Sequence, residues 1–471
     1  MTKEKADLII KNGQICTAQE RYMGDILVDE GKIIAIGHSS IFPEADEVID
    51  VSGKVIIPGV IFTHCHFRDP GYTHKEDFTT GTRAAAAGGV TSTISMTNVK
   101  PVPTKVEVFE KWQEDASKKC IVDFALYGGY GRSSEPSDIA ELTKAGAIGI
   151  KVFNFQDFQA TYPHVPELAI TDWGVMHEIF EACAAASIPV TVHPDLSSWV
   201  NKLVIREYIN KGKVSIDDYH ECAARGITYG HGMVMGSALC IYIAKLTGVK
   251  LLLLHLGMMP EEGYEILRIA KEREGMTNIY GEMECNILFM DQDRADRLGI
   301  YSNGWKTPRD KEAGWQAIND GTVDFCVVEH APHAKEDVEL GRENMWNCHT
   351  GPLGIQEFLP LMLTAVNEGK ITLEKLVQVT SENSAKFFWM YPKKGAIAVG
   401  ADADFTVIDL KKTDLIKTEK ILSKCGWTPW DGYKVKGVPI YTIVRGKVVM
   451  KDGEVIGQPG DGKFISGVGI E

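Results

Sequence analysis

Polar residues able to bind metal follow several apolar runs of the sequence, at the point where each run ends. The most closely spaced pair is His64 and His66, which are separated by Cys65. Because residues i and i+2 of a strand point to the same side, both imidazoles can reach one ion, while Cys65 faces away. Imidazole and carboxylate ligands together suit Zn, Mn, Fe or Ni. The other polar residues at the ends of such runs are Lys151, His193, His255 and Glu329.

Lys151 lies inside the apolar run 148–153, so its side chain is expected to be buried. Burial disfavours the charged form and lowers the pKa of a lysine. A neutral amine can react with carbon dioxide to form a carbamate, an anionic oxygen donor that can bridge two metals. The alternative is an ion pair between Lys151 and a carboxylate. Similarly, a single histidine on an apolar strand is more often a hydrogen-bonded core residue, but four such histidines, a lysine and a glutamate favour a common site.

These residues need a fold that brings the ends of separate strands together. Across residues 58–390, apolar runs of a few residues alternate with segments of helical periodicity. This rhythm predicts an α/β fold, a (β/α)8 TIM-type barrel, whose functional residues lie at the carboxyl ends of its strands. An open doubly wound sheet is the competing fold, but no GxGxxG motif follows an early strand.

The two ends of the chain have a different pattern. Residues 1–57 and 391–471 contain short β-branched runs bounded by Gly and Asn turns. Neither piece is large enough for a stable sandwich alone. We therefore expect both ends to form one small β-sandwich domain beside the barrel domain of residues 58–390.

Composition restricts the location and the partners. The chain has 471 residues, of which 44% are hydrophobic and 24% charged, an ordinary globular balance. Its net charge of -14, with no basic run, argues against a nucleic-acid partner. The ten cysteines are scattered without a CxxC pair, as in proteins with reduced thiols. No apolar segment has the length of a signal peptide or a membrane span, so we expect a cytoplasmic protein without a membrane partner.

The segment PGVIFTHCHFRDPG, residues 58–71, resembles the first metal motif of the amidohydrolase superfamily. The resemblance is to the cyclic amidohydrolase branch, which holds dihydroorotases, allantoinases and hydantoinases. Further segments match this branch in the same order along nearly the whole chain. They are residues 75–77, 81–91, 149–153, 193, 255–256 and 329–333.

The resemblance implies a dinuclear metal site. Two divalent transition-metal ions would be bridged by a hydroxide and by a carbamylated lysine, with zinc as the first choice and manganese or iron as alternatives. The ligands of one ion would be His64, His66 and Glu329, those of the other His193 and His255, with carbamylated Lys151 shared by both.

Three more residues match positions that hold the carboxylate of the substrate in dihydroorotases, namely Arg68, Asn98 and His333. The physical logic fits, because the arginine fork grips a carboxylate through two hydrogen bonds. The alternatives are a salt bridge from Arg68 to Asp69 or Asp77, and a loop-capping role for Asn98.

The resemblance therefore implies hydrolysis of a ring amide C–N bond in a small cyclic amide or ureide. A dihydroorotase-like substrate ranks first, and an allantoin, hydantoin or oxidised-purine ring is the alternative. Glu329 would be the catalytic residue that takes a proton from the attacking hydroxide and delivers it to the ring nitrogen. A non-catalytic scaffold would have lost metal ligands, and deaminase relatives usually lack the bridging lysine. Relatives are usually dimers or tetramers, so we expect a homo-oligomer.

The chain also departs from the pattern of the family. An Asp usually stands two residues before the first His, where this chain has Phe62, so a carboxylate that would orient a ligand is expected to be missing. The last barrel strand usually ends in Asp, and here it ends in Glu329. Residues 282–286 replace a common Pro-His pair, and residues 303–306 depart from a Pro-rich substrate loop. These changes concern the substrate more than the reaction class.

Overall fold

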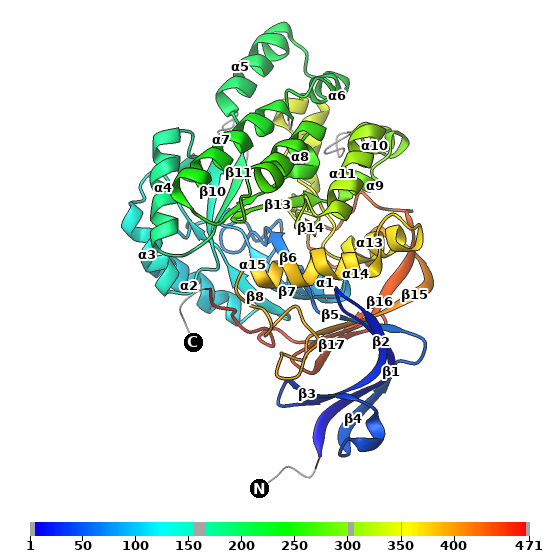
Figure 1. The fold of residues 1–471 in the computed structure, drawn as a ribbon. Helices are drawn as coiled ribbons and strands as arrows, with labels where there is room; N and C mark the ends of the chain where they lie inside the picture. The colour runs from blue at the N-terminus through cyan, green and yellow to red at the C-terminus, as the bar shows by residue number, and fades with distance from the viewer. Residues whose placement is uncertain (1–4, 155–165, 229, 300–305, 350, 468–471) are drawn as a thin grey trace.

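The computed structural model describes residues 5–154, 166–228, 230–299, 306–349 and 351–467 (Figure 1). Its centre is a ring of parallel strands surrounded by helices. One sheet has the order β6 (Val60–Cys65), β7 (Val90–Ser95) and β8 (Asp123–Leu126). The second sheet has the order β14 (Phe325–Val327), β13 (Ile279–Glu284), β12 (Leu251–Leu253), β11 (Val190–Pro194), β10 (Ile150–Asn154) and β9 (Gly128–Gly129).

Backbone hydrogen bonds join the two sheets into a closed barrel. On one side, the amide of Tyr127 donates to Ser95 O at 3.1 Å and that of Ile148 to Leu126 O at 3.0 Å. On the other side, the amide of His66 donates to His330 O at 2.8 Å, and the amide of His330 donates to His64 O at 3.1 Å. The last strand thus pairs with the first, and the predicted (β/α)8 barrel is confirmed.

The alternation of strands and helices follows from local signals. The barrel strands are buried along their length, as expected for parallel strands covered on both faces. Asp77 caps α1 by accepting from the amide of Thr80, and Thr307 forms a capping box with Asp310 at the start of α11. The larger helices around the barrel are α1 (Phe78–Ala87), α2 (Val106–Ser117), α3 (Pro136–Lys144), α4 (Trp173–Ala185), α7 (His231–Thr247), α8 (Glu261–Arg268), α11 (Pro308–Asp320) and α13 (Phe358–Asn367).

Shorter helices complete the barrel and extend one face of it. Those near the barrel strands are α9 (Asn286–Phe289), α10 (Gln292–Leu298), α12 (Lys335–Glu339), α14 (Leu373–Val377) and α15 (Asn383–Phe387). After β11 the chain forms α5 (Ser197–Glu207) and α6 (Ile216–Ala224), which lie at the top of Figure 1. These two helices share a small apolar cluster of their own that includes Val204, Tyr208 and Trp346.

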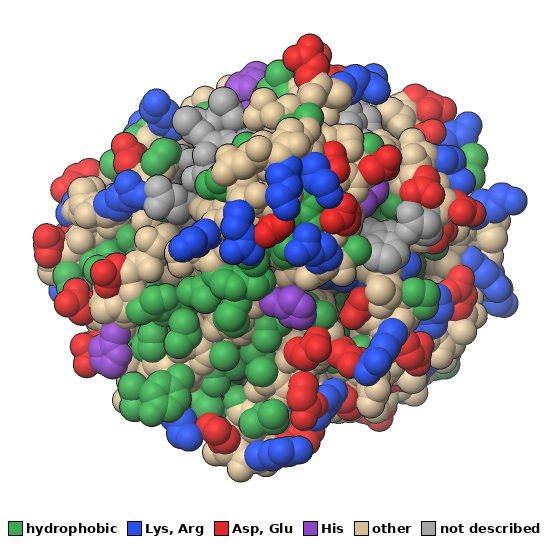
Figure 2. All heavy atoms as spheres, turned by 90° about the horizontal axis from the view of Figure 1, so that it is seen from above, with side chains coloured by type: hydrophobic (Ala, Val, Ile, Leu, Met, Phe, Trp, Pro, Cys, Tyr) green, Lys and Arg blue, Asp and Glu red, His purple; other side chains and the backbone are tan. Residues whose placement is uncertain are grey.

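The face seen from above mixes acidic and basic side chains with a group of hydrophobic ones (Figure 2). On α7, the apolar side chains of Leu239, Tyr242 and Leu246 are exposed. Within the described ranges, no helix combines the length and the hydropathy that a membrane crossing requires.

Both ends of the chain build one nine-stranded sheet. Strand β5 joins the halves, because it pairs in parallel with β1 at Val55 and Gln14 and antiparallel with β15 at Ile56 and Val407. A β-domain made from both termini is therefore present, and the domain bounds at residues 57, 58, 390 and 391 stay a prediction. Its strands are β1 (Ala6–Cys16), β2 (Arg21–Asp29), β3 (Lys32–Gly37), β4 (Ala45–Asp50), β5 (Val55–Pro58), β15 (Phe405–Leu415), β16 (Lys434–Val444), β17 (Lys447–Lys451) and β18 (Glu454–Val455).

A buried ion cluster ties the β-domain to the barrel. The Nζ atom of Lys394 lies 2.7 Å from Asp123 at the start of β8, 3.1 Å from Asp402 and 2.6 Å from Asp404. Burial opposes the charge of the lysine, but the carboxylates of Asp404 and Asp402 outweigh it and raise the pKa of Lys394. Lys32 also pairs with Asp402 and Arg445 with Asp123, so three cations face the three carboxylates, which makes their burial tolerable.

Candidate metal centre

His64 and His66 lie at the carboxyl end of β6, where the pairing with β7 shifts register between Phe62 and Cys65. Because of this irregularity, the neighbours Thr63 and His64 both contact Glu282. The hydroxyl of Thr63 donates to Glu282 Oε2 at 2.7 Å, and His64 Nδ1 lies 2.6 Å from Glu282 Oε1. The irregular end of β6 therefore places His64 where the Glu282 carboxylate holds its ring.

The predicted histidine and glutamate ligands lie around one point. The ring centroid of His64 is 5.3 Å from that of His66 and 5.1 Å from that of His255, and His193 is 4.2 Å from His255. Glu329 Oε1 lies 3.2 Å from His66 Nε2 and 3.7 Å from His64 Nε2. Side chains from the ends of β6, β11, β12 and β14 thus converge, as the sequence predicted.

Lys151 occupies β10, next to the strand that carries His193. Its side chain is fully buried, and Nζ has no hydrogen-bond partner among the described residues. Burial lowers the pKa of Lys151 to about 7, against the opposing effect of the Glu329, Glu282 and Glu284 carboxylates. A large share of its amine is therefore neutral near pH 7, the form that can react with carbon dioxide.

Several buried polar atoms near the converging histidines lack a hydrogen-bond partner among the described residues, and they fit a metal ion. Buried polar groups almost always have a hydrogen-bond partner. Yet His64 Nε2 and His255 Nε2, like Lys151 Nζ, have none among the described residues. Ligand atoms of His64, His255 and Glu329 all lie within 4.8 Å of one another. Burial lowers the pKa of His64 and leaves its imidazole neutral, with a lone pair for a cation. The donor set therefore suits a divalent metal.

Two residues that contact the predicted ligands were not singled out by the sequence analysis, Glu282 and Glu284 on β13. The carboxylate usual at position 62 is absent, as Phe62 implied, but a different carboxylate, that of Glu282, contacts His64 Nδ1. Glu284 Oε1 likewise lies 2.5 Å from His255 Nδ1. Burial raises the pKa of Glu282 to about 7. Burial alone would lower the pKa of His255, but the Glu284 carboxylate outweighs this effect and raises that pKa. The i, i+2 spacing of two glutamates near a strand end was the available signal.

Two residues of the centre have left-handed backbone conformations that non-glycine residues seldom adopt. Arg68 has φ 60° and His255 has φ 66°. Such conformations cost free energy and persist where the surroundings impose them, commonly at functional sites.

Arg68 and His333, two of the predicted substrate residues, contact each other. Arg68 Nη2 lies 3.3 Å from His333 Nε2, and Lys75 Nζ lies 3.3 Å from His333 Nδ1. Lys75 is also paired with Asp337 at 2.9 Å. The cationic side chains of Arg68 and Lys75 on either side of one imidazole make this wall suitable for an anionic group.

The remaining predictions near the pocket have separate outcomes. Asn98 is buried and follows β7, the strand beside β6. Asp69 pairs with Lys119 at 2.7 Å and Asp77 with Lys424 at 2.8 Å. Of the departing segment 303–306, residues 303–305 lie outside the described residues.

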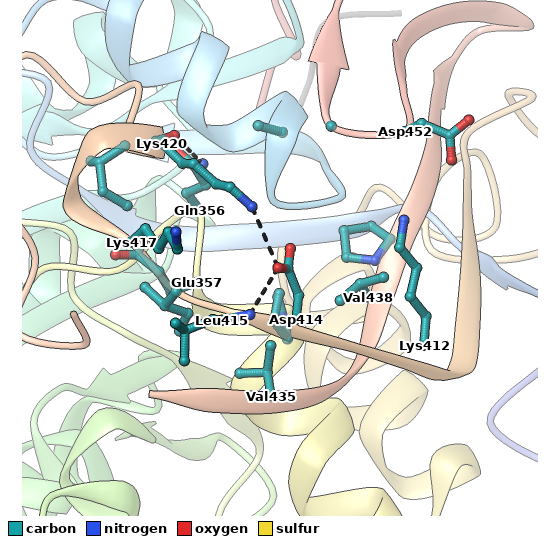
Figure 3. A pocket seen from close by; sticks show the side chains of 16 residues that line it. Gln356, Glu357, Lys412, Asp414, Leu415, Lys417, Lys420, Val435, Val438 and Asp452 are labelled. Carbon is teal, nitrogen blue, oxygen red and sulfur yellow. Dashed lines mark hydrogen bonds and ion pairs between the residues drawn. The ribbon is translucent and has the colours of Figure 1, made fainter. Parts of the chain in front are cut away.

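A separate hollow of about 430 Å³ lies on the flank of the molecule, between the barrel and β15 and β16 (Figure 3). Lys412, Lys417 and Lys420 stand around it, and Lys420 pairs with Asp414 at 3.4 Å. None of the predicted site residues lines this hollow.

A parallel barrel whose strand ends bring together four histidines, a buried lysine and a glutamate has the arrangement of a metal-binding barrel enzyme. The model of the amidohydrolase family matches residues 55–449 of the chain. The chain belongs to the amidohydrolase family, and the resemblance found in its motifs is confirmed.

The chain is similar over almost its whole length to hydantoinases and dihydroorotases. An L-hydantoinase of Paenarthrobacter aurescens is 32% identical over 465 residues, which are 98% of this chain and 98% of the relative. A dihydroorotase of Methanosphaera stadtmanae is 31% identical over 456 residues, 96% of this chain and 98% of the relative. Among solved structures, the L-hydantoinase (dihydropyrimidinase) of Arthrobacter aurescens superposes with a TM-score of 0.90 at 30% identity, covering 98% of this chain and 100% of that one.

Proposed function

We propose that the protein is a metal-dependent hydrolase that opens the ring of a small cyclic amide or ureide at an amide C–N bond. The observation that carries this proposal is the convergence of the four histidines and Glu329, beside the strand on which the buried Lys151 lies. The relatives named above, a hydantoinase and a dihydroorotase, support a cyclic amide as the substrate class.

The residues would hold two divalent cations, with zinc as the first choice and manganese or iron as alternatives. When bound, the cations supply hydroxide at neutral pH and polarise the ring carbonyl. His64, His66 and Glu329 would hold one ion, His193 and His255 would hold the other, and a carbamylated Lys151 would be a ligand shared by both.

Glu329 moves the proton in this proposal. Its carboxylate lies within 3.2 Å of the His66 ring and faces the other ligands, so it can take the proton of the attacking hydroxide. The same proton is then delivered to the ring nitrogen that leaves. The closed end of the barrel beneath the ligands is packed with apolar side chains such as Ile94, Leu252 and Phe325, which keep water out from below.

The substrate that ranks first is a ring that carries an anionic group, as dihydroorotate does. Arg68, which lies beside His333, supports this substrate because an arginine can bind a carboxylate through two hydrogen bonds. A hydantoin, an allantoin or an oxidised-purine ring is the alternative, supported by the L-hydantoinase relative. A homo-oligomer and a cytoplasmic location stay predictions, and light scattering of the purified protein measures the first.

Two measurements on the purified protein test the proposal. Metal analysis is expected to give close to two divalent ions per chain, and ring opening is assayed across dihydroorotate, dihydropyrimidines, hydantoins, allantoin and oxopurines. Hydrolysis of at least one ring that stops on chelation and returns with metal supports the proposal. A chain that binds no metal and opens none of these rings is a scaffold and contradicts it.

A further inference from the structure

The glutamates Glu282 and Glu284 occupy alternate positions of β13 and have no exposed surface. Alternate residues of a strand point to the same side, and both carboxylates reach the metal centre. Burying two carboxylates side by side is costly unless each has a partner. In both cases the partner is the Nδ1 atom of a predicted metal ligand, His64 or His255.

We propose that Glu282 and Glu284 are positioning residues that fix the tautomer and the ring orientation of the two histidines. A carboxylate against Nδ1 keeps the proton on that nitrogen, so the Nε2 lone pair is presented to a cation. His64 Nε2 and His255 Nε2 lack a hydrogen-bond partner among the described residues, while Nδ1 of His255 faces Glu284 Oε1 as an ion pair at 2.5 Å. This inference rests on the proposed function, because it assigns both glutamates to the same metal centre.

Glu282 and the histidine that it contacts lie on strands that are not neighbours. Strand β13 neighbours β14, and β14 in turn joins β6 through His330, so Glu282 reaches past one strand to His64. Thr63 holds the second oxygen of Glu282 through its hydroxyl. The carboxylate is thereby fixed at both oxygens, which suits a residue that must hold a ring in one orientation.

The position that carries an Asp in the family cannot take over this task here. Phe62 points out of the barrel and packs edge-on against Phe358 of α13, with ring centroids 5.6 Å apart. A carboxylate on residue 62 would enter that apolar layer and not the metal centre. The chain therefore orients His64 from β13, the second strand along from β6.

The test compares Glu282→Gln and Glu284→Gln with wild type and with Glu357→Gln. Glu357 is a matched control, because it is a buried glutamate that accepts from Thr428 and contacts none of the predicted ligands. Zinc release into a chelator and the visible absorption of the cobalt(II)-loaded protein are measured for each variant. Thermal unfolding of the metal-free proteins shows whether each variant still folds.

Loss of an outer carboxylate is expected to weaken metal binding by about 10- to 100-fold, with a changed cobalt spectrum. Thr63→Val is expected to give a smaller loss, and Glu357→Gln none. Wild-type release rates and spectra in both Glu282→Gln and Glu284→Gln, in folded protein, overturn the positioning role while leaving the proposed function intact. Wild-type protein that takes up neither zinc nor cobalt overturns both. If a glutamine variant fails to fold, Glu282→Asp, which keeps the charge but shortens the reach, replaces it and is expected to weaken binding as well.

Discussion

Glu282 Oε1 lies 2.6 Å from Nδ1 of His64, although strand β14 stands between the strands that carry them. The contact passes inside β14 and couples the first barrel strand to β13. It also brings a third carboxylate, with Glu284 and Glu329, into the surroundings of Lys151. The centre thus gathers three carboxyl groups, a donor type that suits divalent cations.

Replacing Lys151 by Ala is expected to abolish loading with two metals, because the shared ligand is lost. Metal analysis and the ring-opening assay measure the effect. Lys250→Ala is the matched control, since Lys250 is a half-buried lysine that contacts Phe387 O and the Trp389 ring and lies outside the centre. Full activity and two ions per chain in Lys151→Ala would contradict the bridging role.

Replacing Glu329 by Gln is expected to lower kcat by about 10²–10⁴-fold, the contribution of a positioned acid–base group. Glu329→Asp, which restores the usual residue of the family, is expected to keep more activity than the glutamine variant. Steady-state kinetics at saturating metal separates this effect from loss of metal. Equal rates for Glu329→Gln and wild type would exclude Glu329 as the group that moves the proton.

Metal uptake by the metal-free protein is expected to become faster as the pH rises through about 7. Burial lowers the pKa of Lys151 from 10.5 to about 7, so the amine is mostly charged below this pH and mostly neutral above it. Only the neutral form reacts with carbon dioxide. Reconstitution with zinc, with and without bicarbonate, at a series of pH values measures this dependence. A rate that is independent of both pH and bicarbonate would argue against a carbamate.

Replacing Arg68 by Lys is expected to lower kcat/KM for a ring that carries a carboxylate by about 10- to 100-fold, since a charge-assisted hydrogen bond contributes ~1.5–3 kcal/mol. A neutral hydantoin is expected to lose much less. Arg83→Lys on the exposed side of α1 is the control. An equal loss for charged and neutral rings would show that Arg68 does not recognise the carboxylate.

Replacing Lys394 by Met is expected to lower the free energy of unfolding by about 3–5 kcal/mol, because three buried carboxylates lose their shared cation. Its neighbour Lys393 is exposed, so Lys393→Met is a control that changes the same charge without burial. Denaturant unfolding measures both variants. Equal stability of the two would show that the cluster does not hold the β-domain to the barrel.

The sequence pointed to the side chains that converge at this end of the barrel because their positions obey local rules. His64 and His66 are spaced for one face of a strand, and the others each end an apolar run. Glu284 also lies at the end of a strand, but the sequence could not show that it contacts His255. That contact depends on how β12 and β13 pair. The register shift in β6 was equally hidden, because it arises from how β6 pairs with β7.

The barrel itself followed from the alternation of apolar runs and helices, and the β-domain from the turn-rich ends of the chain. The helices α5 and α6 between β11 and β12 were not foreseen as a separate packing unit. Their apolar residues, such as Val204 and Tyr208, face Trp346, which is far away in the sequence. A pairing of that kind is set by tertiary packing alone.

The seam between the first and last barrel strands runs through the backbone of His64, His66 and His330. The proposed ligands lie on both sides of that seam, so ring closure and assembly of the centre would be one event. A nascent or truncated chain that ends before β14 has neither a sealed ring nor Glu329. On the proposed function, tight capture of the ions would therefore follow closure of the ring.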